Sequence, residues 1–131
     1  MSAGMDQSAA MNDKATTLQA VKDLIARFTA ERDWQQFHSP KNVAMALVSE
    51  AAELMAHFRW SDGGREAAIP EDPRSLREIR HEVADVLVLL AEFANVTNID
   101  MSQAVEEKMA INAERYAVDK SRGTARKYDR L

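Results

Sequence analysis

Residues 50–53 read Glu-Ala-Ala-Glu and residues 82–85 read Glu-Val-Ala-Asp, each inside an apolar segment. The acids of each pair are three residues apart, so on a helix both carboxylates lie on one side, about one turn from each other. If the two helices pack together, four carboxylates converge, and their repulsion favours a cation between them. A hard divalent ion with oxygen ligands, above all Mg²⁺, meets that need. The sequence therefore predicts a metal site formed by Glu50, Glu53, Glu82 and Asp85.

Such a pair of acids has a simpler interpretation, because one pair at this spacing is more typical of a solvated helix surface. Two pairs on the two most apolar segments, each beside an apolar stripe, support the metal site as much as the solvated surface. A di-iron bundle site is disfavoured, because it uses Glu-x-x-His on two helices, and positions 53 and 85 hold Glu and Asp.

Apolar residues at helical spacing predict four helices over residues 16–32, 40–58, 75–97 and 100–116. Each predicted start has capping residues: Thr16 or Thr17, Ser39 before Pro40, Ser75 or the earlier Asp72-Pro73, and Asp100. No alternation typical of strands stands out, so the fold class is all-α, a four-helix-bundle type.

The third predicted helix is apolar on more than one face. Its expected core stripe comprises Ile79, Val83, Val86, Leu87, Leu90 and Ala94. Leu89 and Phe93 lie outside that stripe and are apolar too. This pattern predicts packing on several helices or on another subunit, and so an oligomer.

Length and composition bound the class of protein. The 131 residues fit one domain: a flexible tail over 1–15 and a single all-α domain over 16–131, ending in a polar, basic tail over 118–131. The net charge of -4 argues against broad binding to nucleic-acid polymers. The chain has no cysteine, which excludes disulfides and thiolate metal sites. Without a long apolar run or a signal-peptide pattern in residues 1–13, we expect a cytoplasmic protein with no membrane segment.

Aromatic side chains stand in the connectors at both ends of the second predicted helix. Trp34, Phe37 and His38 precede it, and Trp60 follows it in a loop of about fifteen residues. Core packing is the commoner fate of tryptophan. Their position in connectors favours recognition of a planar base.

Cationic and amide side chains follow the acids. Lys108, Asn112 and Arg115 share the polar side of the fourth predicted helix, and Arg122 and Lys127 lie in the tail. By itself the spacing of the three helix residues is better explained by a solvated face, and the alternative is that these side chains contact phosphates. His57 lies one turn beyond Glu53 and could support the metal ligands, although surface histidines are more common.

Taken together, these residues resemble the MazG-like family of all-α nucleotide pyrophosphohydrolases, in particular its dCTP pyrophosphatase branch. The similar segments cover most of residues 18–131. They are 31–38 (Glu-Arg-Asp-Trp-Gln-Gln-Phe-His), 40–42, 47–54, 58–60, 82–87, 108–112, 115–116, 121–123 and 127–128.

The resemblance implies Mg²⁺-dependent cleavage of a nucleoside triphosphate, dCTP or a modified dCTP, to the monophosphate and pyrophosphate. Water would attack in line at the α-phosphorus. It implies that the four acids are both catalytic and metal-binding, and that the substrate contacts Trp34, Phe37, His38, Trp60, Lys108, Asn112, Arg115, Arg122 and Lys127. It also implies a homotetramer or homodimer with sites between subunits.

Two positions depart from the resembled branch: Ile25 stands where the animal proteins have His, and Leu89 where they have Tyr. Both belong to substrate recognition, so another modified or non-standard nucleotide stays open as the substrate. A non-catalytic helical protein that binds nucleotides or other partners is the remaining alternative.

Overall fold

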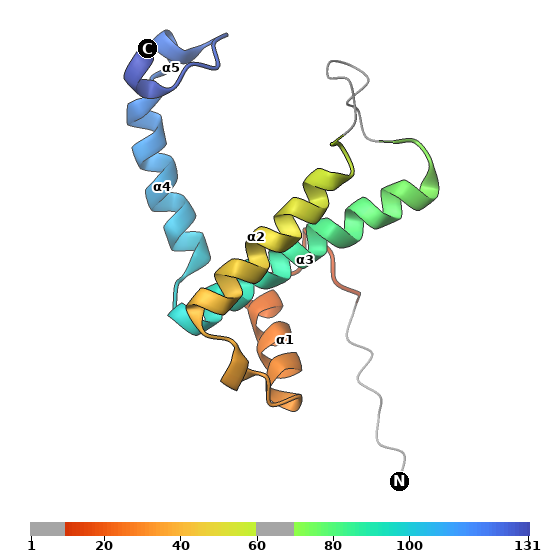
Figure 1. Cartoon of the computed structure of the whole chain (residues 1–131). Helices are drawn as coiled ribbons and strands as arrows, with labels where there is room; N and C mark the ends of the chain where they lie inside the picture. The colour runs from red at the N-terminus through yellow and green to blue at the C-terminus, as the bar shows by residue number, and fades with distance from the viewer. Residues whose placement is uncertain (1–9, 60–69) are drawn as a thin grey trace.

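The computed structural model describes residues 10–59 and 70–131 (Figure 1). In chain order the elements are α1 (Leu18–Glu31), η1 (Gln35–Phe37), α2 (Pro40–Ala56), α3 (Pro73–Thr97), α4 (Met101–Arg115), α5 (Val118–Ser121) and η3 (Tyr128–Arg130). Within these residues there is no β-strand, which confirms the all-α fold class. None of the helices in the described part combines the length and apolar character needed to cross a bilayer. Trp60 and the glycines of its loop lie outside the described residues.

Side-chain caps fix where the four long helices begin. Thr17 and Ser39 accept hydrogen bonds from the backbone N–H groups of residues 20 and 42, at 3.0 and 3.2 Å. Asp72 accepts from residues 74 and 75, so α3 begins at Pro73 rather than after Ser75. Asp100 accepts from residue 103 at 2.9 Å. The predicted helix starts are therefore confirmed to within a few residues, because capping chemistry is local.

Three helices form the packed part of the chain. Figure 1 shows α2 and α3 side by side in opposite directions, and α1 packs across the C-terminal half of α3. Two hydrogen bonds fasten α1 there: Asn95 Nδ2 donates to the Lys22 carbonyl, and Lys22 Nζ donates to the Ile99 carbonyl, both at 3.0 Å. The buried apolar side chains are Ile25, Val43, Ile79, Ala91 and Ala94.

The fourth long helix, α4, does not join this packing. It extends away from α2 and α3, and none of its residues is buried (Figure 1). The prediction that Val83, Leu87 and Leu90 lie in a core is therefore wrong for the single chain, since they are 52%, 39% and 41% exposed. The helical period places these side chains on shared faces, but it does not specify which element covers them.

The C-terminal segment is more ordered than the predicted polar tail. The Ser121 hydroxyl donates to the carbonyls of Tyr116 and Ala117, closing α5 onto the end of α4. The ring of Tyr128 then meets that of Tyr116 edge to face, with centroids 6.0 Å apart. At the other end of the described chain, the Asn12 carbonyl accepts hydrogen bonds from residues 15 and 16 and forms a turn before α1.

Candidate functional site

The antiparallel packing of α2 on α3 brings three of the four predicted acids together. Glu50, Glu82 and Asp85 each offer a carboxylate oxygen, and these oxygens lie within 4.8 Å of one another. Glu50 and Glu82 are half-buried, whereas Asp85 is exposed. We call these three residues the acidic cluster. Glu53 is exposed and is not one of the three, so the structure brings only part of the predicted quartet into one group.

The acidic cluster is electrostatically crowded. Loss of hydration at the junction of the two helices raises the pKa of Glu50, and the negative charges of Asp85, Glu82 and Glu53 raise it further. A hydrogen bond between the side chains of Glu50 and Glu82 acts in the same direction. Carboxylates held this way resist carrying full charge together, and a divalent cation relieves that repulsion. An all-oxygen set of acids fits Mg²⁺, whose preferred ligands are carboxylates and water.

His57 supports the cluster from the end of α2. Its Nε2 lies 3.9 Å from Glu82 Oε1, and both side chains are half-buried. A residue in this place can orient a carboxylate that binds metal, as neighbouring side chains commonly do. His57 therefore lies beside a predicted metal ligand, as one of the two interpretations of the sequence required.

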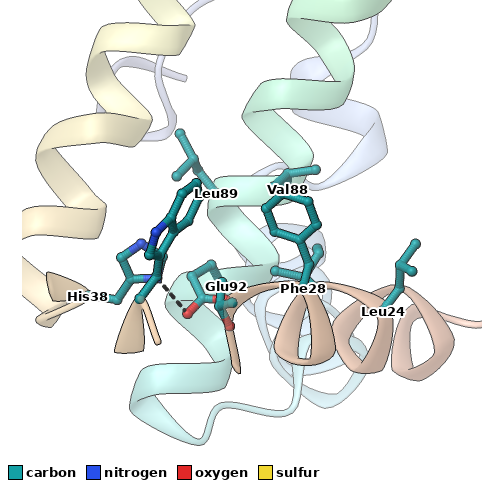
Figure 2. A pocket seen from close by; sticks show the side chains of 9 residues that line it. Leu24, Phe28, His38, Val88, Leu89 and Glu92 are labelled. Atoms are coloured by element: carbon teal, nitrogen blue, oxygen red, sulfur yellow. Dashed lines mark hydrogen bonds and ion pairs between the residues drawn. The ribbon is translucent and has the colours of Figure 1, made fainter. Parts of the chain in front are cut away.

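A separate apolar pocket lies further along α3, between α1, the connector and α3 (Figure 2). Its volume is about 420 Å³, which suits a small organic ligand. Trp34 and His38, two of the predicted substrate-binding residues, both line it, with ring centroids 6.4 Å apart. The other lining residues are Leu24, Ile25, Phe28, Thr29, Val88, Leu89 and Glu92. Phe37 is 60% exposed and does not line this pocket.

One carboxylate in this pocket was absent from the sequence analysis. Glu92 is only 3% exposed, and its Oε1 lies 3.1 Å from His38 Nδ1 (Figure 2). Its other oxygen, Oε2, is buried and has no hydrogen-bond partner among residues 10–59 and 70–131. The sequence did contain a signal, because Glu92 interrupts the apolar run over residues 86–94. A charged side chain at a position that the helical period buries indicates either a pairing partner or a site.

The acidic cluster and the pocket share one stripe of α3. Glu82, Asp85, Leu89 and Glu92 follow one another at intervals of three or four residues, which places them along the same side of the helix. From Asp85 to Glu92 the rise along the axis is about 10 Å. The acidic cluster and the pocket are therefore separated by about two turns of one helix.

The predicted phosphate-binding residues lie elsewhere in the single chain. Lys108, Asn112 and Arg115 are carried by α4, which extends away from α2 and α3 (Figure 1). The Arg115 guanidinium lies 4.6 Å from the ring centre of Tyr128, and Lys127 Nζ lies 5.8 Å from it. Arg122 is exposed at the end of α5. Arg115 and Lys127 thus lie beside the same Tyr128 ring, at the far end of α4 from the acidic cluster (Figure 1).

The chain is similar to known proteins both in sequence and in structure. The model of the MazG-like family matches residues 45–131. The chain is 43% identical to dCTP pyrophosphatase 1 of Mus musculus over 118 residues, covering 88% of this chain and 68% of that protein. It is 40% identical to dCTP pyrophosphatase 1 of Homo sapiens over 115 residues, with the same coverage. Among solved structures it is similar to a pyrophosphatase from Archaeoglobus fulgidus DSM 4304. The TM-score is 0.68 at 28% sequence identity, covering 82% of this chain and 99% of that one.

Proposed function

The chain belongs to the MazG-like family, and on that premise we propose that it cleaves dCTP or a modified dCTP, with Mg²⁺, to the monophosphate and pyrophosphate. It is a nucleoside triphosphate pyrophosphatase, a hydrolase of phosphoric anhydrides. The observation that carries the proposal is the acidic cluster, because three converging carboxylates on packed helices suit a divalent metal and a polyphosphate.

Glu50, Glu82 and Asp85 would hold the metal, and Glu53, one turn along α2, would complete the set. When bound, Mg²⁺ supplies Lewis acidity at phosphate oxygens and lowers the pKa of water. The chain's own contribution is to hold the carboxylates in place through the packing of α2 on α3, with His57 against Glu82.

A carboxylate of the cluster also serves as the base. A carboxylate within reach of the attacking water can accept its proton as a general base. Water that attacks the α-phosphorus in line would give its proton to such a group, and pyrophosphate would leave. No covalent nucleophile is needed for this reaction.

The base of the nucleotide occupies the apolar pocket, where Trp34 and His38 frame it. Trp60 is part of the same proposal, although it lies outside the described residues. The phosphates would contact Lys108, Asn112 and Arg115, with Arg122 and Lys127 nearby. Because α4 stands apart from the acids of its own chain, these contacts are proposed to come from a second subunit in a homodimer or homotetramer. The exposed apolar face of α3 supports such an assembly.

A modified or non-standard nucleotide is the second candidate substrate. It is favoured by the pocket itself, in which Ile25 and Leu89 contribute apolar surface rather than hydrogen-bonding groups. The reaction would be the same, and only the base would differ.

The test is pyrophosphate release from a panel of standard and modified nucleoside triphosphates, with Mg²⁺ and with chelator. Metal-dependent release is expected, and Glu50→Gln and Asp85→Asn are each expected to fold but to lose it by orders of magnitude. Glu78→Gln is the matched control on α3, because Glu78 pairs with Arg74 and lies outside the cluster. No release from any nucleotide at high enzyme concentration would instead support the non-catalytic interpretation.

A further inference from the structure

The carboxylate of Glu92 is built into the pocket with one oxygen unused. Its side chain is 4% exposed, and Oε1 is taken by His38 Nδ1 at 3.1 Å. Within the part of the chain that the structure describes, Oε2 is buried without a partner. The other neighbours in the pocket are mostly apolar, including Phe28, Val88 and Leu89 (Figure 2).

This arrangement is costly for a residue with a purely structural role. Burying a carboxylate oxygen without a hydrogen bond removes its hydration and returns nothing. An apolar side chain of similar size at position 92 would avoid the cost at Oε2 and would leave only His38 Nδ1, which is partly exposed, without its partner. A buried acceptor that lines a cavity is therefore better explained by a donor that arrives with the ligand.

We propose that Glu92 Oε2 accepts a hydrogen bond from the exocyclic amino group of the nucleobase, so that Glu92 selects amino-bearing bases over their oxo counterparts. This inference rests on the proposed function, in which the pocket holds the base. It identifies the specificity-determining residue and narrows the substrate class to nucleotides such as those of cytosine.

His38 leaves only one oxygen of Glu92 to recognise the base, because it pairs with the other. Since Oε1 faces His38, the buried Oε2 is the Glu92 oxygen that has no partner among the described residues and is left for a ligand to pair. The hydroxyl of Thr29, another polar group of the lining, already donates to the Ala26 carbonyl at 3.0 Å. An amino group satisfies Oε2. The carbonyl oxygen that uracil carries in the same place would instead meet a second acceptor, and both would stay unpaired.

The position of Glu92 agrees with the rest of the site. It lies seven residues beyond Asp85 on the same side of α3, so a base held there leaves its phosphates directed along the helix toward the acidic cluster. Trp34 offers an aromatic face to the same pocket. Selection of the base and chemistry at phosphorus are thereby separated along one helix.

The experiment compares kcat/KM for dCTP and dUTP in the full-length protein and in Glu92→Gln and Glu92→Ala. The wild type is expected to favour dCTP. Glu92→Ala is expected to lower the dCTP:dUTP ratio by roughly tenfold or more. The amino group of cytosine loses its hydrogen-bond acceptor, and the carbonyl oxygen of uracil no longer faces a second acceptor. Glu92→Gln keeps the shape and can either accept or donate, so it should lower the ratio as well. Glu78→Gln, a carboxylate of α3 outside the pocket, should leave the ratio unchanged.

Binding of dCMP and dUMP, measured by calorimetry in the presence of chelator, separates this inference from the proposed function. If the wild type hydrolyses triphosphates but its dCTP:dUTP ratio is the same in both Glu92 variants, the inference is overturned and the proposed function stands. If no triphosphate is hydrolysed, the proposed function fails. In that case the inference is upheld only if the wild type binds dCMP more tightly than dUMP and both Glu92 variants lose this preference. Equal binding of dCMP and dUMP by the wild type overturns it.

Discussion

The protein holds carboxylates in two contrasting environments on the same helix. In the acidic cluster, Glu82 and Asp85 face Glu50 across the junction with α2, and their negative charges act on Glu50. In the pocket, Glu92 is surrounded by apolar side chains and has one polar partner, His38. The carboxylates of the cluster have more negative charge than their surroundings balance, whereas Glu92 Oε2 in the pocket lacks a hydrogen-bond donor among the described residues. Each shortage indicates what the ligand must supply: a cation at one end and an N–H group at the other.

This contrast separates catalysis from recognition. The cluster is open enough for water and phosphate, since Asp85 is exposed. The pocket is nearly closed to water at Glu92, which strengthens every polar contact made there. A nucleotide that bridges the two would react at the first and be identified at the second.

The largest expected effect follows from removing a charge of the cluster without touching the pocket. Glu82→Gln should lower kcat on the order of 100-fold or more, because a ligand of the proposed metal is lost. Binding of dCMP should change little, since Glu82 does not line the pocket. Pyrophosphate release and calorimetry on the same preparation check both statements.

If Glu82→Gln weakened dCMP binding as strongly as Glu92→Ala, the separation between the acidic cluster and the pocket would be contradicted. The two environments would then act as one site, and the assignment of separate roles would be wrong. Glu78→Gln, four residues before Glu82 on α3, controls for loss of a carboxylate on this helix.

The two environments also differ in how far the sequence predicts them. Spacing within each helix already indicated Glu50, Glu82 and Asp85, because i and i+3 positions are local information. The caps at Thr17, Ser39 and Asp100 were local as well, and so the helix starts agreed.

The pocket depends on contacts between segments far apart in the chain. Ile25, Trp34 and Glu92 meet only once α1 and the connector have packed on α3, and no periodicity specifies that packing. For the same reason the sequence overestimated the core, since Val83 and Leu87 have the right period but no covering element in the single chain.

A smaller effect is expected at the aromatic wall of the pocket. Trp34→Ala should raise KM for the preferred nucleotide by roughly tenfold with little change in kcat, because stacking on the base is lost while the acids stay in place. Steady-state kinetics distinguishes this from Glu82→Gln, which acts on kcat. Trp34→Phe should recover much of the affinity.

Phe37→Ala offers a sharper form of the same test. The sequence predicts that both aromatic residues contact substrate, whereas the pocket geometry gives Phe37 the smaller role, since it is 60% exposed outside the lining. Equal rises in KM for Trp34→Ala and Phe37→Ala would favour the sequence-based prediction over the geometry.

The smallest effect concerns the cap of α3, the helix that carries both environments. Hydrogen bonds from the side chain and backbone of Ser75, and from the backbone N–H of Arg74, lower the pKa of Asp72. A carboxyl whose pKa is lower in the folded state adds stability above its unfolded value of about 3.9. That contribution falls as the pH drops through the folded pKa. Asp72→Asn, which still caps but does not titrate, should therefore lose less stability than the wild type on acidification below pH of about 4. Asp72→Ala should lower the melting temperature slightly at neutral pH as well.

Because the cap lies ten residues before Glu82 and twenty before Glu92, fraying should reach the acidic cluster first. Asp72→Ala should accordingly raise the Mg²⁺ concentration needed for turnover. Its effect on the dCTP:dUTP ratio of kcat/KM should be smaller. Melting temperatures measured from about pH 3 to about pH 7 span the titration of this carboxyl and test the predicted change in stability. An equal loss of base discrimination would mean that α3 responds as one rigid unit, and that the two environments are less independent than their separate surroundings indicate.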